Sequence, residues 1–145
     1  MVGVRAVGPG EAWFLLSSPE SVIHMRDGTF RTETLERDCT IMHLAFLRPD
    51  LGYAAGLFGA LFRWDGARWT RIRPPTLTDD RESHLRGIVA LAEDDVWVGA
   101  DQFLLHFDGR SWARLPLPAV AVAGYVERIG DAVALTAGPI LVRRG

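Results

Sequence analysis

Few residues of this chain have the types and spacing that catalysis or metal binding needs. The chain has one cysteine and four histidines, at positions 24, 43, 84 and 106, and no two histidines stand at HxH or HxxxH spacing. The familiar zinc-ligand patterns are therefore missing. Cys39 has no adjacent base to activate its thiol, so we interpret it as a packed side chain. No Ser/His/Asp set, pair of placed carboxylates or phosphate-binding glycine motif stands out, so we expect no enzyme, no metal and no cofactor.

The acidic run Glu93-Asp94-Asp95 is the one cluster that could suggest a cation. It lacks the twelve-residue pattern of a calcium-binding loop. We therefore interpret it as a solvated turn.

Tryptophan and arginine recur together at positions that favour ligand or partner binding. Side chains two residues apart on a strand share a face, which places Trp69 with Arg71 and Arg73, and Trp112 with Arg114. An arginine that lies over the indole makes a cation–π contact of about 0.5–1 kcal/mol at an exposed site, and this explains the pairing without a ligand. The alternative is a surface on which a sugar ring stacks.

A second candidate set consists of His24, Arg63 and His106. These three residues occupy the same position in successive copies of a sequence repeat, provided that the turn in the first copy is one residue shorter than in the other copies. They would then form a series of polar side chains that lines one face and binds a partner. The simpler interpretation is the solvated side of alternating strands.

These residues belong to a repeated hairpin. An apolar run over Phe103–Phe107 is followed by Asp108-Gly109 and by a second strand near Trp112, and similar phrases occupy residues 60–69 and, more weakly, 22–30. An Asp-Gly pair between two strand-like runs predicts a two-residue turn with positive φ at both positions.

The hairpin recurs roughly every 40 residues, in the range of propeller blades. The runs between turns are short and apolar and lack helical periodicity. Each of the three complete copies divides into four short strands, which is the composition of one blade. We therefore predict an all-β fold: a single β-propeller domain over residues 1–145, built from four-stranded antiparallel blades at approximately 1–39, 40–83, 84–120 and 121–145.

The fourth copy lacks its outer strand. Its last strand consists of Ile140, Leu141, Val142 and Arg143, and an unprotected strand edge invites pairing with another chain. In the complete copies Trp13, Tyr53 and Trp97 fall at equivalent places on the second strand, which indicates packing between blades.

The second copy, with Phe46-Leu47-Arg48-Pro49-Asp50 and Arg63-Trp64-Asp65-Gly66, resembles a WD-type propeller blade. The Asp-Gly-x-x-Trp phrase at Asp65 and Asp108 resembles blades of bacterial kelch-like propellers. The resemblance implies a ring, which typically has about four to eight blades. Three arrangements fit: a compact four-bladed ring, a larger ring completed by a second copy, or part of a longer or split propeller.

Composition restricts the partners. The formal net charge is −2, and the isoelectric point is near 6.1, so no global field favours nucleic acid or a membrane surface. All 16 basic residues are arginine, as is typical of a GC-rich bacterial genome. With one cysteine, no recognisable signal peptide and no apolar stretch of membrane-spanning length, we expect a cytoplasmic protein.

Taken together, the sequence predicts a non-enzymatic propeller scaffold for protein–protein interaction. We expect it to complete its ring as a homo-oligomer or with a partner chain. The alternative is a carbohydrate-binding, lectin-like propeller with a glycan ligand, and a third hypothesis is a hydrolase-type propeller.

Overall fold

The computed structural model describes residues 3–16, 21–37, 39–77, 83–117 and 124–135, and the backbone of 140–143. Within these ranges the chain forms fifteen β-strands, and none of the described segments is a helix that could span a membrane.

Blade 1 consists of β1 (Gly3–Gly8), β2 (Glu11–Leu15), β3 (Ser21–Arg26) and β4 (Thr29–Thr34). Blade 2 consists of β5 (Thr40–Arg48), β6 (Leu51–Leu57), β7 (Leu61–Trp64) and β8 (Trp69–Arg71). Blade 3 consists of β9 (Leu85–Ala92), β10 (Asp95–Ala100), β11 (Phe103–Phe107) and β12 (Trp112–Pro116). Blade 4 consists of β13 (Val126–Ile129), β14 (Ala132–Leu135) and β15 (Ile140–Arg143).

Each blade is an antiparallel sheet in which strand order follows the sequence. The prediction of an all-β fold with four antiparallel blades is confirmed, and each sheet lies inside one of the predicted residue ranges. The sheet of blade 4 has three strands in the described part of the chain, with β15 as its outer strand. The side chains of 140–143 lie outside the described residues, so only the position of this edge is observed.

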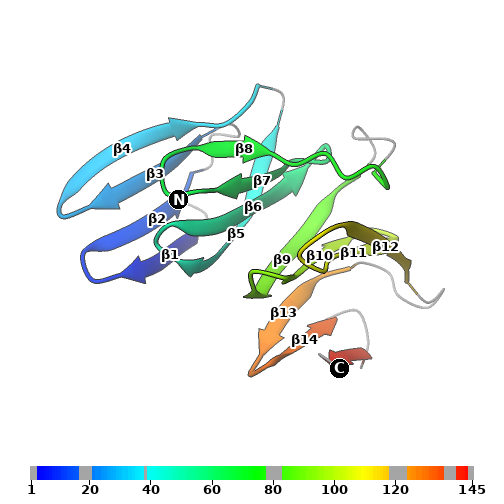
Figure 1. Ribbon diagram of the computed structural model, residues 1–145. Helices are drawn as coiled ribbons and strands as arrows, with labels where there is room; N and C mark the ends of the chain where they lie inside the picture. The colour runs from blue at the N-terminus through cyan, green and yellow to red at the C-terminus, as the bar shows by residue number, and fades with distance from the viewer. Residues whose placement is uncertain are drawn as a thin grey trace.

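The blades stack in sequence order through their first strands. β5 contacts both β1 and β9, and β9 contacts β13. Blade 1 and blade 4 therefore lie at opposite ends of a curved row (Figure 1). Three apolar cores fill the junctions between successive blades, centred on Trp13, Tyr53 and Trp97.

The Asp-Gly turns differ from the two-residue turn that the sequence predicts. Only the weakest copy forms it: Asp27 and Gly28 both have positive φ, 49° and 78°, and Arg26 pairs with Thr29. At Asp65 and Asp108 the flanking pairs enclose four residues, Trp64 with Trp69 and Phe107 with Trp112. In both turns the Asp Oδ1 accepts the backbone N–H groups two and three residues later, at 2.8–2.9 Å. These side-chain hydrogen bonds stabilise the wider loop.

The strand register confirms the predicted equivalences. His24 pairs with Trp13, Arg63 with Tyr53, and His106 with Trp97. In blade 4 the corresponding pair is Ala134 with Leu141, so this blade lacks the aromatic residue.

Candidate functional site

A partly buried carboxylate network organises the side of blade 1 that faces blade 2. Glu11 Oε1 accepts a hydrogen bond from Arg26 Nη2 at 2.7 Å and lies 2.7 Å from His24 Nε2. The His24 ring stacks on Trp13 with a centroid distance of 3.9 Å. His24 is therefore a buried residue, and its assignment to a solvated strand face is wrong, because blade 2 packs over that face.

Blade 3 repeats this arrangement. Asp95 Oδ1 accepts a hydrogen bond from Trp97 Nε1 at 2.8 Å and lies 2.9 Å from His106 Nε2. His106 is half-buried and stacks on Trp97 with a centroid distance of 3.9 Å. The interpretation of the acidic run as a solvated turn is wrong for Asp95, which is buried. Glu93 is exposed and forms an ion pair with Arg48 of blade 2.

Sequence reasoning missed Glu11 and Asp95. Both residues open the second strand of their blade, two residues before the tryptophan. The repeated pattern acid-x-Trp, with a histidine on the next strand, is a signal that could have found them. Blade 2 has Leu51 in place of the acid, and its cross-strand pair is Tyr53 with Arg63.

The hydrogen bonds of these networks fix side chains in place. In each network one carboxylate oxygen contacts two nitrogen atoms and fixes a histidine against an indole. Among the described residues no group of three or more His, Cys, Asp or Glu side chains is arranged to hold a metal ion. Cys39 is buried, and its Sγ donates to the carbonyl of Glu36 at 2.9 Å.

A cleft of about 450 Å³ opens beside the blade 1 network. One wall comes from strands β3 and β4 and their turn, and the other comes from β7 and the turn that follows it. The cleft is lined by His24, Arg26, Asp27, Thr29, Arg31, Glu33, Trp64, Gly66 and Ala67. We call it the blade 1–2 cleft.

The walls of the blade 1–2 cleft combine an aromatic floor with charged side chains. Trp64 is buried and is fixed by a hydrogen bond from its Nε1 to the carbonyl of Pro49 at 3.0 Å. Thr29, Arg31 and Glu33 alternate along β4, so they project from the same face of that strand. Arg31 is exposed, and it makes no ion pair or hydrogen bond with the other described residues.

The network sets the charge state beneath the cleft. Burial raises the pKa of Glu11, but the hydrogen bonds with Arg26 and His24 and the positive charge of Arg26 outweigh burial and leave this pKa below its usual value. The hydrogen bond and the charge of Glu11 in turn raise the pKa of Arg26. Arg26 is therefore held by Glu11, whereas Arg31 is exposed and pairs with none of the residues that the structure describes.

A smaller hollow of about 310 Å³ lies between the first strands of blades 1 and 2. Val4 and Arg5 line it from β1, and Met42 and His43 line it from β5. Burial lowers the pKa of His43, and the charges of Arg5 and Arg86 lower it further. This hollow therefore favours the neutral form of His43.

The predicted candidates on β8 contribute mainly to packing. Trp69 is half-buried, with its ring centroid 5.4 Å from that of Trp13. Arg71 forms an ion pair with Glu36 at 2.5 Å and lies over the Phe62 ring at 5.7 Å. Arg73 is exposed and also reaches Glu36, at 3.4 Å.

The candidates on β12 follow the same pattern. Trp112 is half-buried and packs on Phe107, at a centroid distance of 5.2 Å. Arg114 lies over the Phe103 ring at 3.9 Å. The prediction that these arginines lie over Trp69 and Trp112 is wrong: Arg71 lies over Phe62, its partner on the neighbouring strand, and Arg114 lies over Phe103, a diagonal neighbour. Arg63 is exposed. The predicted residues are spread over blades 1, 2 and 3, so the structure does not bring them together in one site.

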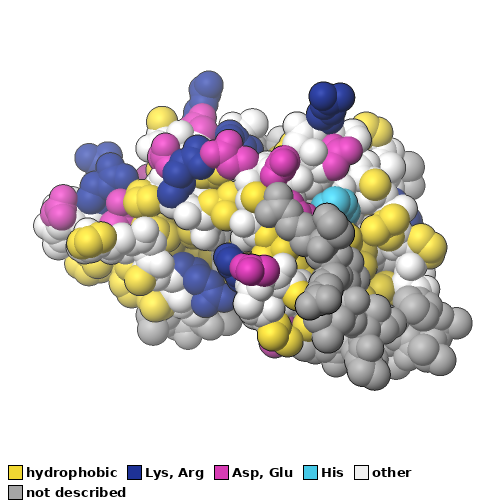
Figure 2. Space-filling model, turned by 60° about the horizontal axis from the view of Figure 1, so that its bottom comes forward, with side chains coloured by type: hydrophobic (Ala, Val, Ile, Leu, Met, Phe, Trp, Pro, Cys, Tyr) yellow, Lys and Arg dark blue, Asp and Glu magenta, His cyan; other side chains and the backbone are white. Residues whose placement is uncertain are grey.

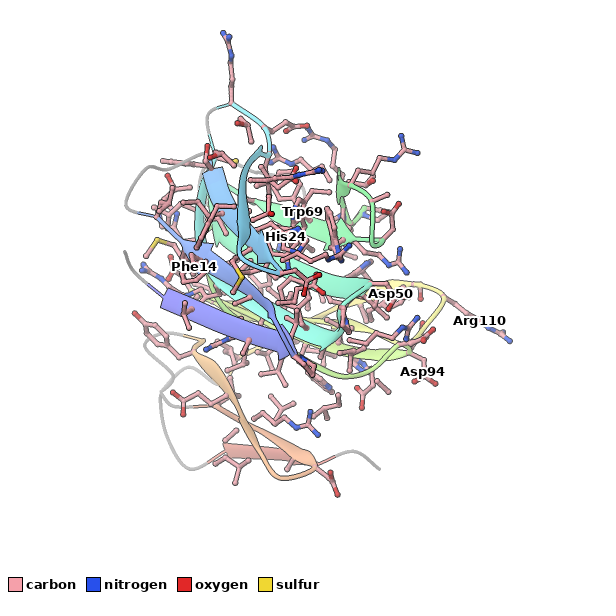
Figure 3. All side chains as sticks on the ribbon, turned by 90° about the vertical axis from the view of Figure 1, so that its left-hand side faces the viewer. Phe14, His24, Asp50, Trp69, Asp94 and Arg110 are labelled. Atoms are coloured by element: carbon pink, nitrogen blue, oxygen red, sulfur yellow. The ribbon has the colours of Figure 1, made fainter. Side chains whose placement is uncertain are left out.

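Figure 3 shows where these positions lie on the molecule. His24 and Trp69 lie in the middle of the blades, and both contact Trp13. Asp50, Asp94 and Arg110 lie in turns at one end of the blades, on the right of the view. Of the predicted candidates, only His24 lines the blade 1–2 cleft.

The arrangement is similar to solved structures of YCF48. A structure of YCF48 bound to D1 peptide has a TM-score of 0.68 over 93% of this chain and 46% of the YCF48 chain, with 18% identity. The fold is a β-propeller fold. YCF48 from Cyanidioschyzon merolae gives the same TM-score, with 14% identity, over 92% of this chain and 47% of that chain. The chain thus spans about half the length of these structures. No family model and no curated protein matches the sequence.

Proposed function

We propose that this chain is a non-enzymatic β-propeller scaffold that binds a segment of another protein in the blade 1–2 cleft. The observation that carries the proposal is the cleft itself, whose volume of about 450 Å³ lies in the usual range for ligand sites. It combines a fixed aromatic floor with an exposed arginine at its rim. The Glu11 network beside it is held by hydrogen bonds between side chains, which favours a binding surface over a reactive centre.

The shape of the cleft suits an extended peptide. Its outer wall is β4, the edge strand of blade 1, from which alternate side chains point into the cleft. A peptide in extended conformation presents its own side chains with the same period of two. That one propeller of the same fold, YCF48, has been seen bound to D1 peptide supports this kind of ligand.

The charges define the peptide further. Arg31 is exposed and pairs with none of the described residues, so it can bind a carboxylate, and the exposed Ala67 adds an apolar contact to the cleft wall. We therefore expect peptides that carry an acidic residue next to an apolar one. Glycan binding has less support, because Trp13, Trp64 and Trp97 are buried and Trp69 and Trp112 are half-buried in packing.

The experiment is selection of a random peptide library on the immobilised protein, followed by affinity measurement on the recovered peptides. We expect acidic peptides, and we expect Arg31→Glu to weaken their binding by about tenfold or more, because a hydrogen bond to a charged group is lost.

The matched control is Arg110→Glu, which makes the same charge change in a turn of blade 3 that does not line the cleft. It should leave the affinity unchanged. Equal affinity of the selected peptides for the original protein and for Arg31→Glu would refute the assignment of the cleft.

A further inference from the structure

Blade 1 has a second face, turned away from blade 2, on which none of the described strand residues is charged. Directly paired residues on neighbouring strands share a face, so the register of β1 to β4 identifies its members. They are Val4, Ala6, Ala12, Phe14, Ser21, Ile23, Met25, Phe30, Thr32 and Thr34. We call this surface the outer face of blade 1.

The outer face of blade 1 is apolar and open to solvent. Val4 is 44% exposed and Phe30 is 63% exposed, and the Phe30 ring lies 6.2 Å from that of Phe14. Apolar side chains gather at the left-hand end of the molecule, where blade 1 lies (Figure 2). Phe14 lies on the sheet nearest the viewer in Figure 3. An exposed sheet face in a soluble protein usually carries polar and charged side chains, so this face has the composition of a contact surface.

The equivalent positions in blades 2, 3 and 4 are packed against a neighbouring blade. The register makes Phe14 equivalent to Ala54, Val98 and Leu135, and all three of these are buried against the preceding blade. Phe30 is equivalent to Trp69 and Trp112. These two tryptophans pack into the cores between blades 1 and 2 and between blades 2 and 3. The outer face of blade 1 therefore has the character of a blade–blade contact surface, and no described blade of this chain covers it.

We propose that a second copy of this chain covers this face with the outer face of its blade 4. Two copies then form a closed ring, because each supplies one blade 1 face and one blade 4 face. The matched YCF48 chains are about twice as long as the region they share with this chain, so a ring of that kind has room for two such arrays. A contact that occurs twice around a two-fold axis gives a closed assembly.

The outer face of blade 4 complements that of blade 1. Ala132 and Ala134 of β14 share this face with Ile129, which is 58% exposed, and with Glu127. Small residues on the second strand leave room for the large side chains Phe14 and Phe30, as Ala54 does for Trp13 at the junction of blades 1 and 2. The contact is independent of the blade 1–2 cleft, which uses the opposite face of blade 1.

The test is the mass of the full chain in solution, measured by size-exclusion chromatography with light scattering. We expect twice the chain mass of 16.0 kDa. Phe30→Asp and Ile129→Asp should each raise the dissociation constant by about 100-fold or more, since each places a carboxylate in an apolar contact. Leu115→Asp, at a residue of β12 that is 39% exposed, is the control and should leave the dimer intact. Thr32→Arg, also on the outer face of blade 1, should weaken the dimer as Phe30→Asp does. With this second variant the conclusion does not depend on the folding of a single variant.

Mixing the two variants distinguishes this ring from other dimers. Phe30→Asp retains an intact blade 4 face and Ile129→Asp an intact blade 1 face, so an equimolar mixture should recover a heterodimer through one contact. A monomeric original protein would overturn the proposal. A dimer that Ile129→Asp leaves unchanged would show that blade 1 pairs with something else, and open polymers would exclude the closed ring.

Discussion

At the scale of residues, the chain uses an acidic side chain to fix a histidine against a tryptophan. In blade 1 the acid is Glu11 and in blade 3 it is Asp95. Blade 2 has Leu51 at this position, and there the histidine is replaced by an exposed arginine, Arg63. The acid therefore occurs with the histidine and the tryptophan as a set.

We expect Asp95→Ala to lower the free energy of unfolding by about 1–3 kcal/mol, because Trp97 Nε1 and His106 Nε2 both lose their acceptor in a largely buried site. Urea denaturation followed by tryptophan fluorescence measures this loss. Asp131→Ala, at an exposed turn position of blade 4, is the control. Equal stability of the two variants would show that the Asp95 network contributes little.

The pKa of Glu11 gives a prediction about acid stability. It lies below its usual value of 4.5 in the folded protein, so the folded state favours the ionised carboxyl more than the unfolded state does. The stabilisation is fully present well above pH 4.5 and is lost as the pH falls through the lowered folded value. Glu11→Gln should therefore be less stable than the original protein at pH 7, and the difference should shrink on acidification. A difference that stays constant from pH 7 to pH 3 would contradict this.

The equivalence of His24, Arg63 and His106 could be predicted from the sequence, because it depends only on counting residues from the turns. The burial of His24 could not, since it depends on blade 2 closing over the strand. The blade 1–2 cleft was missed for the same reason. Its walls, Arg31 and Trp64, are far apart in the sequence and meet only through blade packing.

At the scale of elements, the second strand of blade 3 approaches the backbone of blade 4 directly. A Cβ atom at Gly99 would lie 1.5 Å from the carbonyl oxygen of Gly124. The N–H of Gly124 donates to the carbonyl of Ala100 at 3.0 Å. The position of blade 4 therefore depends on a residue without a side chain.

We expect Gly99→Ala to displace blade 4, because the added methyl group meets backbone and not a flexible side chain. Hydrogen exchange should become faster in β13 and β14, while blade 1 remains protected. Gly3→Ala is the control, because its Cβ would only touch Leu15 Cδ1 at an ordinary 3.5 Å. Unchanged exchange in blade 4 would mean that the junction adapts without loosening.

The hairpins themselves could be predicted, but their turns only in part. Apolar runs bounded by Asp-Gly mark the strands, whereas turn width depends on whether the Asp side chain binds the backbone beyond the glycine. Asp65 and Asp108 do so, and Asp27 instead adopts a positive φ.

At the scale of the whole molecule, repeat counting predicted the propeller architecture because each blade is a local unit. The contact made by the outer face of blade 1 could not be predicted from the sequence, because it depends on residues outside that blade. The absence of charge from that face becomes visible only when the strand register shows which side chains share it.

Hydrogen exchange of the original protein, measured at high concentration and after dilution, tests the two-copy ring most directly. We predict that exchange at high concentration is slower in β1 and β2 of blade 1 and in β13 and β14 of blade 4, because successive blades meet through their first strands, with no change at the Arg110 turn. Identical exchange at both concentrations, or protection confined to other strands, would contradict the ring.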